Sequence, residues 1–396
     1  MPKVGDHTLG VGAESTWGTG VAPTARFEVT SESMKLEVER IESKALKASR
    51  RYLSSSGWAA GQKNVTGDIE MEAQSNGMGL WFKNLLGAAA TTTPAGATNA
   101  RKHVFGLQQI AGTVASFSSG ATSITFTASA KPVVGQVFSG AGLDAATVIT
   151  AVSGASSPYT LTVSPAATGS STETTYTAGA TTSVDGQSLT VEAVRTDRTG
   201  TAHKFTYSGV VIDELEIEAK VGEFVNLKFA LDGKDESVTA AGASSASYAS
   251  SVPLVFVGAA ITVANSAVEV KEFNVKLTSG RAKERYILGQ STKLKQVESD
   301  MREISGSINC EWSGLTAYER FTAGTPAAVV AKFETVANIE SGVKGYLQVT
   351  IPVARFDGET PTGGGEIVEH SLPFVGLDNG TANPVEVEIV DLTASY

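Results

Sequence analysis

The chain has 396 residues and a formal net charge of −10, with 41 acidic side chains against 31 Lys and Arg. This balance excludes the broad basic surface with which proteins hold nucleic acid. The single cysteine, Cys310, excludes an internal disulfide and a cysteine-rich metal site, and the four histidines show no metal-ligand spacing. Hydrophobic residues make up 41% of the chain, which is enough for a sizeable core.

The chain carries no recognisable targeting or membrane segment. Its first residues lack the apolar run of a secretory signal peptide. The longest nearly apolar stretch, residues 252–264, is too short to span a bilayer and contains a proline. We therefore expect a soluble protein that is made in a cytoplasm.

Alternation of apolar and polar residues dominates the chain and predicts β-strands. In the clearest case the alternation runs over residues 215–219 and resumes over 225–231 after a short turn. This pattern predicts a hairpin with one buried face and one solvated face. The same pattern predicts further strands at 67–73, 268–277 and 385–392.

Helical periodicity is rare in this sequence. Residues 77–87 carry an apolar stripe that ends at Gly87, and this stripe predicts a short helix. A weaker stripe over 316–324 predicts a second helix. The predicted fold is mainly β and mostly antiparallel, with two short helices.

Two segments differ in composition from the rest of the chain. Only Lys131, Asp144 and Glu173 are charged within residues 110–182, where Ser, Thr, Ala and Gly dominate. Such composition is typical of disorder, but the regularly spaced Val, Ile, Phe and Leu favour a small inserted all-β domain. The second low-complexity stretch, residues 239–251, predicts a linker.

Two stretches of the chain resemble each other. Residues 65–72 read V-T-G-D-I-E-M-E, and residues 304–311 read I-S-G-S-I-N-C-E. Each follows a predicted strand, at 27–36 and at 268–277, and each precedes a short predicted helix that ends in glycine. The same elements in the same order indicate two copies of one module.

The connections before the two repeated strands are long and equally basic. Residues 41–64 hold five Lys and Arg against one Glu, and residues 281–295 hold the same, so each connection carries a net +4. The predicted domains are a discontinuous first module, the inserted domain, the linker and a second module, at 1–109 with 183–238, 110–182, 239–251 and 252–396.

No motif in the chain points to catalysis or to a bound cofactor. The three glycines at 363–365 lack the strand-to-helix context and the lysine of a phosphate-binding loop. Residues 232–236 resemble a calcium loop only faintly, because their ligand spacing does not fit. Cys310 lies within an alternating strand, as a core thiol does. We expect no enzyme activity, no cofactor and no metal site.

Several motifs, taken in order, resemble the tail tube proteins of long-tailed bacteriophages. The opening run G-V-G-A-E-S-T-W-G-T at residues 10–19 resembles the start of those proteins. The most family-like part is G-D-I-E at 67–70, followed by the predicted helix and its glycine at 79–87. Further matching segments lie at 30–33, 41–46 and 207–209, and the resemblance covers most of the chain outside 110–182.

This resemblance implies two tandem β-sandwich or barrel modules, each with a short helix, in a structural virion protein. Such proteins form stacked rings, which are the tube through which DNA leaves the capsid. The implied partners are further copies of the chain, the tape-measure protein, the tail-terminator and baseplate proteins, and DNA that passes without specific binding. The implied location is the virion tail, after assembly in the host bacterial cytoplasm. The segment at 110–182 is similar instead to small β modules that decorate phage and bacterial surface proteins.

Two groups of charged residues are the candidate site residues in such a tube. An acidic or neutral lumen would let DNA slide, since a basic wall would hold its phosphates. The lumen-facing candidates are Asp68, Glu70, Glu72, Glu214, Glu216 and Glu218, although an ordinary solvated outer face is an equal alternative for any one of them. We expect the basic connections to contact the neighbouring ring through Lys44, Lys47, Arg50, Arg51, Arg281, Lys283, Arg285, Lys293 and Lys295.

The number of chains in each ring follows from the two modules. Related single-module proteins form hexameric rings, so a chain with two modules implies a trimer with pseudo-sixfold symmetry. Six chains stay possible if only one half lines the lumen. Two other functions also stay open: a phage capsid decoration or receptor-binding protein, suggested by the Ser/Thr-rich segment, and a β-sandwich glycan hydrolase.

Overall fold

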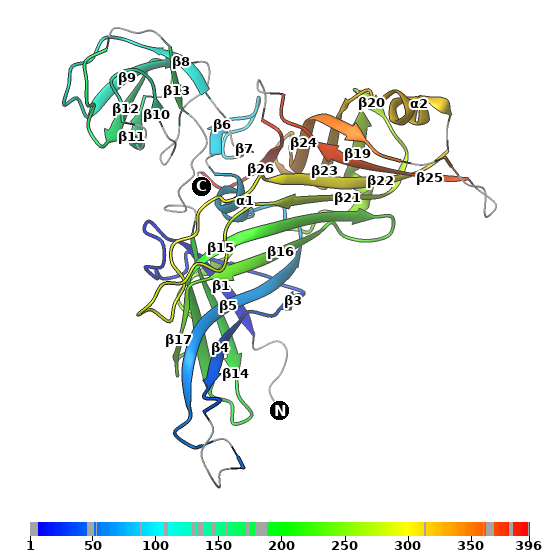
Figure 1. Cartoon of the computed structure of the whole chain (residues 1–396). Helices are drawn as coiled ribbons and strands as arrows, with labels where there is room; N and C mark the ends of the chain where they lie inside the picture. The colour runs from blue at the N-terminus through cyan, green and yellow to red at the C-terminus, as the bar shows by residue number, and fades with distance from the viewer. Residues whose placement is uncertain are drawn as a thin grey trace.

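In the computed structural model of the chain, the described residues are 7–45, 51–52, 54–87, 89–106, 110–128, 132, 136, 138–144, 147–154, 157–171, 175–178, 188–312, 314–358, 360–361, 368–379, 383–394 and 396. Strands dominate these residues and helices are few, as Figure 1 shows. The prediction of a mainly β fold is therefore confirmed.

The elements fall into three groups along the chain. The first group contains β1 (Thr8–Ala13), β2 (Ala25–Phe27), β3 (Ser31–Glu32), β4 (Lys35–Glu42), β5 (Trp58–Glu72), α1 (Gly79–Leu86), β6 (Ala89–Thr92) and β7 (Arg101–Gly106). The second contains β8 (Ile110–Val114), β9 (Ser123–Ala128), β10 (Phe138–Ser139), β11 (Val148–Ser153), β12 (Tyr159–Ser164) and β13 (Tyr176–Ala178). The third contains β14 (Leu189–Thr196), β15 (Ala202–Lys220), β16 (Asn226–Gly233), β17 (Asp235–Thr239), β18 (Ser247–Tyr248), η2 (Phe256–Gly258), β19 (Ala259–Val263), β20 (Ser266–Ala267), β21 (Val270–Thr278), β22 (Glu303–Glu311), α2 (Leu315–Ala323), β23 (Ala327–Glu340), β24 (Val343–Phe356), β25 (Glu369–Gly376) and β26 (Glu386–Asp391).

Both predicted helices are present. Gly87 follows α1 with φ 96° and Gly324 follows α2 with φ 64°, and glycine adopts these positive dihedrals at little cost. Helix α1 buries Trp81, whose ring stacks on Phe229 of β16 with 4.7 Å between ring centroids. Among the described residues no helix is long and apolar enough to cross a membrane.

Eight strands form one antiparallel surface, called here the continuous sheet. Their order is β4, β5, β16, β15, β21, β22, β25 and β24. The predicted hairpin is confirmed, since Leu215 of β15 lies opposite Phe229 of β16. The two predicted modules, at 1–109 with 183–238 and at 252–396, are called here the first and second halves of the chain. At the centre of the sheet Glu214 lies opposite Thr278, so β15 of the first half pairs with β21 of the second half.

A second layer, called here the outer layer, covers the apolar face of the continuous sheet. It contains β1, β2, β14 and β17 over the first half, and β19, β23, β26, β7 and β6 over the second half. The long strands β15 and β24 bend from one layer into the other, pairing first with the outer strands and then with the continuous sheet. A single hydrophobic core fills the space between the layers, with large side chains such as Trp81, Phe229, Phe273 and Phe333.

The pairing pattern of the first half recurs in the second half. Seven strand pairs have a counterpart of the same antiparallel sense. The pairs β1–β14, β1–β2, β14–β15, β15–β16, β15–β17, β4–β5 and β5–β16 correspond in that order to β19–β23, β19–β20, β23–β24, β24–β25, β24–β26, β21–β22 and β22–β25.

The Ser/Thr-rich segment forms a separate sheet of six strands, β8 to β13. Phe126, Phe138 and Tyr176 are fully buried in a hydrophobic cluster that belongs to this sheet alone. Figure 1 shows it as a lobe apart from the two main layers. The lobe joins the outer layer, since β7 leads into it and β14 follows it.

The predicted strand over 27–36 is interrupted. Regular strand structure is interrupted at 28–30 and again at 33–34, so β2, β3 and β4 replace one strand. Across the second break the Ser33 amide still donates to the Asp68 carbonyl of β5 at 2.9 Å, whereas the Met34 amide points away from β5 and donates to the Glu32 carboxylate at 2.6 Å.

Part of the segment predicted as a linker is anchored. Strand β18 pairs in parallel with β2, where Ser247 lies opposite Ala25. The Arg26 guanidinium donates to the Ala246 carbonyl at 2.7 Å, and the Ser244 amide donates to the Glu192 carboxylate at 2.8 Å. These contacts hold the connection between the two halves along the outer layer of the first half, at β2 and β14.

Candidate functional site

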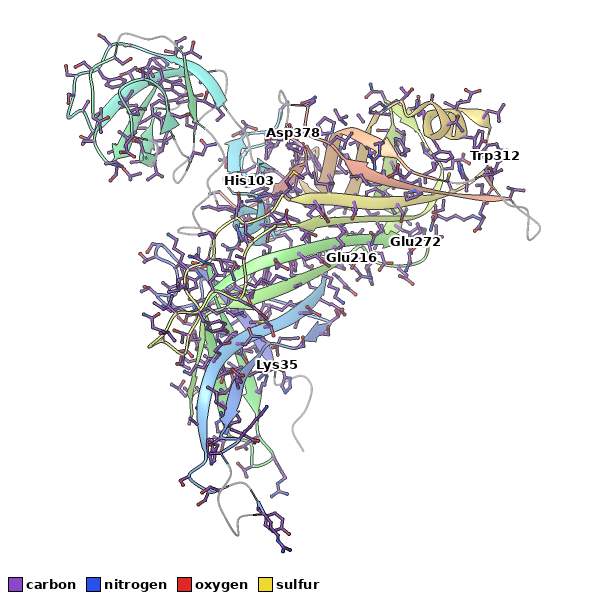
Figure 2. All side chains as sticks on the ribbon, viewed as in Figure 1. Lys35, His103, Glu216, Glu272, Trp312 and Asp378 are labelled. Carbon is purple, nitrogen blue, oxygen red and sulfur yellow. The ribbon has the colours of Figure 1, made fainter. Side chains whose placement is uncertain are left out.

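The solvated face of the continuous sheet, called here the polar face, carries the acidic residues that the sequence singled out. On β5 and β15 these residues alternate with buried ones such as Ile69 and Leu215, so their side chains point away from the core. Pairing places Lys228 opposite both Glu70 and Glu216. The polar face thus brings together Asp68, Glu70, Glu72, Glu214, Glu216 and Glu218, and Figure 2 labels Glu216 and Glu272 on it.

Alternating charges form one ladder across the polar face. Opposite residues on successive strands are Glu70, Lys228, Glu216 and Lys276. The Lys228 ammonium lies 3.2 Å from the Glu70 carboxylate. The Lys276 ammonium lies 2.6 Å from the carboxylate of Glu214, two residues before Glu216 on β15. The hydrogen bond from Lys228 lowers the pKa of Glu70 below its ordinary value, and the same contact raises the pKa of Lys228. Because opposite charges on paired strands attract, this ladder supports the register of the sheet.

A second ladder alternates carboxylates with amides. Glu72, Asn226, Glu218 and Asn274 lie opposite one another in that order. Lys220 adds an ion pair at the end of β15, where its ammonium contacts Glu218 and lies 3.2 Å from Glu272. These two carboxylates raise the pKa of Lys220.

The polar face is acidic in sum even though many of its charges are paired. Along β5, β15, β16, β21, β22 and β25 ten carboxylates lie on it against four lysines, of which Lys271 lies at a bulge of β21 and joins this face through ion pairs with Glu311 and Glu369. The carboxylates are Asp68, Glu70, Glu72, Glu214, Glu216, Glu218, Glu272, Glu303, Glu311 and Glu369, and the lysines are Lys220, Lys228, Lys271 and Lys276.

The second basic connection folds back onto the first half of its own chain. The Tyr286 hydroxyl donates to the Lys63 carbonyl at 2.8 Å, and the Lys63 amide donates to the Ser291 carbonyl at 2.8 Å. The Lys293 ammonium is buried and pairs with the buried Asp232 carboxylate at the end of β16. Burial raises the pKa of Asp232 even though Lys293 acts in the opposite direction.

The predicted loop residues differ in exposure. Lys44, Arg51 and Lys283 are exposed, Arg285 and Lys295 are half-buried, Arg281 and Lys293 are buried, and Lys47 and Arg50 lie outside the described residues. The burial of Arg281 and Lys293 corrects the expectation that both present their charge to another subunit. Lys293 instead holds the connection against Asp232 within the chain.

The first basic connection lies at the end of a long hairpin. Strands β4 and β5 stay paired as far as Glu42 and Trp58, and the hairpin projects from the two layers at the bottom of Figure 1. Trp58 is half exposed and lies beneath the Arg40 guanidinium, 5.5 Å from the ring centroid. Tyr52 near the tip is 88% exposed.

Exposed apolar side chains gather at the two ends of the strands in the continuous sheet. The turn between β15 and β16 exposes Val221 and Phe224, and Phe256 and Val257 of η2 are exposed next to it, since Phe224 bridges Val255. At the opposite end, the connection between β21 and β22 exposes Ile287, Leu288 and Met301. Sequence reasoning missed these residues; their signal is large apolar side chains inside turns, where polar residues are usual.

The opening motif contains a buried carboxylate that serves the fold. Glu14 is 1% exposed and accepts hydrogen bonds at 2.8 Å from the amides of Gly18 and Gly209 and from the hydroxyls of Ser188 and Thr190. It thereby ties the loop after β1 to β14 and to the bend of β15. The signal in the sequence is a single acidic residue among small ones in the run at 10–19.

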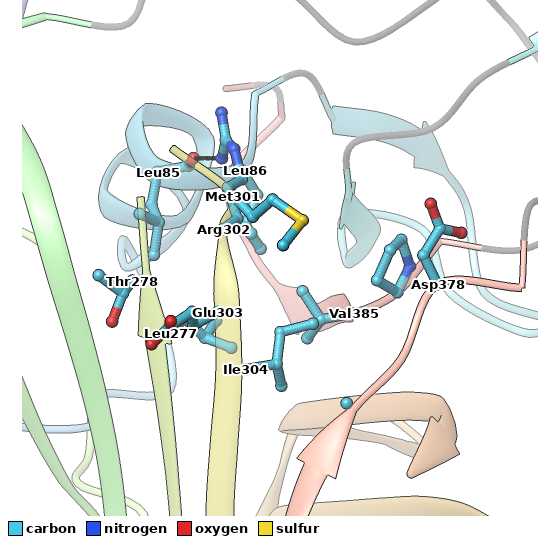
Figure 3. A pocket seen from close by; sticks show the side chains of 12 residues that line it. Leu85, Leu86, Leu277, Thr278, Met301, Arg302, Glu303, Ile304, Asp378 and Val385 are labelled. Carbon is cyan, nitrogen blue, oxygen red and sulfur yellow. Dashed lines mark hydrogen bonds between the residues drawn. The ribbon is translucent and has the colours of Figure 1, made fainter. Parts of the chain in front are cut away.

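The pocket between the two halves has a mostly apolar lining. The pocket in Figure 3, of about 270 Å³, lies where the two halves meet, and its apolar lining includes Leu85, Leu277, Ile304 and Val385. The Arg302 guanidinium beside the pocket donates to the Leu85 carbonyl at 3.0 Å. This hydrogen bond satisfies one of the carbonyls in the last turn of α1, which have no partner within the helix. Within the described residues no group of three or more His, Cys, Asp or Glu could hold a metal ion.

Comparison with known proteins agrees with this architecture. The family described as phage tail tube protein matches residues 6–376, which is nearly the whole chain. None of the curated proteins compared with the chain matches it. The match spans both halves, the segment between them and the strands of the continuous sheet, and the chain therefore belongs to the phage tail tube protein family, whose members are structural components of phage tails.

Proposed function

We propose that copies of this chain assemble into stacked rings that form a phage tail tube, the conduit for DNA ejection. The observation that carries the proposal is the continuous sheet, which has eight antiparallel strands, an acidic solvated face and no strand beyond its two lateral edges among the described residues. Unpaired edges are normally a liability, and closing sheets from several chains into one barrel removes them. The implied partners are the tape-measure, tail-terminator and baseplate proteins.

In this proposal the polar face lines the lumen. Its excess of carboxylates repels DNA phosphates, and the exposed lysines Lys228, Lys276 and Lys220 are engaged by neighbouring carboxylates. A wall that held phosphates through free lysines would bind DNA by releasing counterions. An acidic wall leaves the duplex free to slide.

The two halves act as equivalent modules, and three chains complete a ring. Each half contributes four strands to the continuous sheet, so three chains give about 24 strands. At ~4.8 Å spacing and ~40° tilt such a barrel is ~48 Å across, which leaves room for one duplex after side chains are added. Six chains would give a barrel near 100 Å by the same formula, far wider than one duplex needs.

The rings stack through the two ends of the strands. One end presents the exposed basic residues Lys44, Arg51 and Lys283 together with apolar Leu288, whereas the other end presents apolar Phe224. The second end also carries the exposed carboxylates Glu223, Glu311 and Glu369. Apolar contacts and opposite charges make the two ends complementary.

The six-stranded lobe lies outside the tube wall as an inserted domain. The lobe is inserted in the sequence between β7 and β14. Both of these strands belong to the outer layer, on the far side of the core from the polar face. A lumen that contains DNA has no space for it. This placement makes the lobe a decoration that the tube wall does not need.

Electron microscopy of the purified protein tests the proposal. Negative-stain images should show hollow tubes or ring stacks with a central channel. A protein that stays monomeric at high concentration, at every salt concentration and pH tried, would contradict self-assembly and favour a capsid decoration or receptor-binding role.

A further inference from the structure

The junction between the two halves is a template for a junction between two chains. At this junction β15 and β21 run antiparallel in an unbroken register from Glu214 opposite Thr278 to Lys220 opposite Glu272. Glu216 lies opposite Lys276 in the middle. Since the strand pairings of the halves correspond, each strand of this junction has a counterpart elsewhere in the chain.

The counterpart of β21 is the edge formed by β3 and β4. The repeated strands align Gly67 with Gly306, and therefore Thr66 with Ser305. Lys35 lies opposite Thr66, as Lys276 lies opposite Ser305. Lys35 thus occupies the position of Lys276 on the same polar face, and Figure 2 labels it near the base of the projecting hairpin.

The counterpart of the inner part of β15 is the segment that follows β24. Ile212 and Phe356 are equivalent because they lie opposite Leu231 and Phe374, which pair in turn with the two repeated glycines. An aspartate follows each, so the chain segments read I-D-E-L-E and F-D-G-E-T. By this alignment, which carries the bulge of β15 at Asp213 over to Asp357, Thr360 occupies the position of Glu216.

Both counterpart edges lack a neighbouring strand among the described residues. Strand β4 pairs with β5 on one side only, and β3 likewise. The Asp357 amide donates to the Pro373 carbonyl of β25 at 2.9 Å, so Asp357 extends the sheet beyond β24, and no described strand lies on its other side. These are the two lateral edges of the continuous sheet.

The register also accounts for an irregular residue at the first edge. Met34, the counterpart of Val275, turns its amide and carbonyl outward, because the amide of its neighbour Ser33 donates to Asp68 of β5. The aligned residue on the other edge is Pro361, which has no N–H to donate. The Met34 carbonyl instead receives hydrogen bonds from the side chains of Arg195 at 2.8 Å and Tyr207 at 2.9 Å, and the Met34 amide donates to the Glu32 carboxylate, so this residue is satisfied without a bond from Pro361.

We propose that this chain binds a second copy of itself by repeating the internal junction, with residues 357–361 of one chain antiparallel to residues 34–38 of the next and Thr360 opposite Lys35. The proposal rests on the ring assembly above and adds the contacting edges and their register. It makes the junction between chains and the junction between halves alternate around the ring.

Cysteine cross-linking tests the register. Opposite residues of an antiparallel pair have Cα atoms roughly 4.5–5.5 Å apart, within the range that a disulfide bridges. The double variant Lys35→Cys, Thr360→Cys should form a ladder of covalent species on a non-reducing gel after mild oxidation of assembled tubes. A mixture of the two single variants should give covalent dimers, because each chain then has one partner cysteine.

The internal junction supplies a matched control. The double variant Glu216→Cys, Lys276→Cys should form its disulfide within one chain, so the band on the non-reducing gel stays at the mass of a single chain. The double variant Glu37→Cys, Thr360→Cys is a second control, in which the cysteines are shifted by two residues from the proposed register. The register would be wrong if the shifted cysteines cross-link as well as the registered pair, or if tubes form without any cross-link from the registered pair. Neither result would contradict the proposed tube. Wild-type protein that forms neither rings nor tubes would overturn the proposed function itself.

Discussion

Removal of the Glu14 carboxylate should destabilise the first half of the chain. In the Glu14→Ala variant the amides of Gly18 and Gly209 lose their acceptor, and both are held in place by the backbone. The hydroxyls of Ser188 and Thr190 rotate toward other acceptors and contribute less. An orphaned amide costs about 2 kcal/mol when buried, as at Gly209, and about 1 kcal/mol when half-buried, as at Gly18. We therefore expect a loss of about 3 kcal/mol.

Urea unfolding at neutral pH measures this loss, as a lower midpoint at unchanged slope. Hydrogen exchange of peptides that contain Gly209 locates it, because the amide there loses its protection. Glu14→Gln keeps one acceptor oxygen and should lose about half as much. Glu28→Ala, at an exposed position nearby, is the matched control and should stay within roughly 0.5 kcal/mol of wild type. A Glu14→Ala variant as stable as this control would refute the reasoning.

Three further predictions concern the sheet and the lobe. Gly306→Ala should prevent soluble expression or cost several kcal/mol in urea unfolding, because a Cβ there would lie 2.4 Å from the Asn274 carbonyl oxygen; an unchanged midpoint would contradict the close approach. Lys228→Ala should lose about 0.2–1 kcal/mol at pH 7. Since Lys228 lowers the pKa of Glu70, that difference should vanish as the pH falls well below the ordinary 4.5, and a difference that persists in acid would exclude the ion pair as its source. Replacing residues 110–182 with a short Gly/Ser bridge should leave tubes intact in electron micrographs, and loss of all assembly would count against an external lobe.

Local patterns predicted the strands and their faces well. Alternation over 215–219 identified the strand, its buried side and its hairpin partner, because the period of two is a property of the backbone itself. Glycine after an apolar stripe predicted both helix ends for a similar local reason. The six acidic residues of the polar face followed from the same alternation, and their shared face needed only the pairing of β5, β16 and β15.

Contacts between distant parts of the chain could not be predicted in this way. Lysine is rarely buried without a partner, and the partner of Lys293 is Asp232, 61 residues away in the sequence. The net +4 connection therefore indicated a contact with the neighbouring ring, whereas the fold places Asp232 against its Lys293. The pairing of β7 with β26 cannot be predicted from local patterns either, because it joins residues 101–106 to residues 386–391. The hydrogen bond from the Met34 amide to the Glu32 carboxylate likewise depends on one side chain, which the alternation pattern does not reveal.

The differences between the two halves lead to a last prediction about symmetry. Among the described residues, the projecting hairpin and the six-stranded lobe belong to the first half alone, and β6 and β7 pair at the edge of the outer layer of the second half alone. In a ring of three chains the lumen would therefore show nearly sixfold symmetry, because both halves give it four strands. The outer wall would show threefold symmetry, with three lobes in each ring. Cryo-electron microscopy of tubes measures both at once. Six lobes around each ring, with one half of every chain away from the inner wall, would contradict the equivalence of the halves and support six chains.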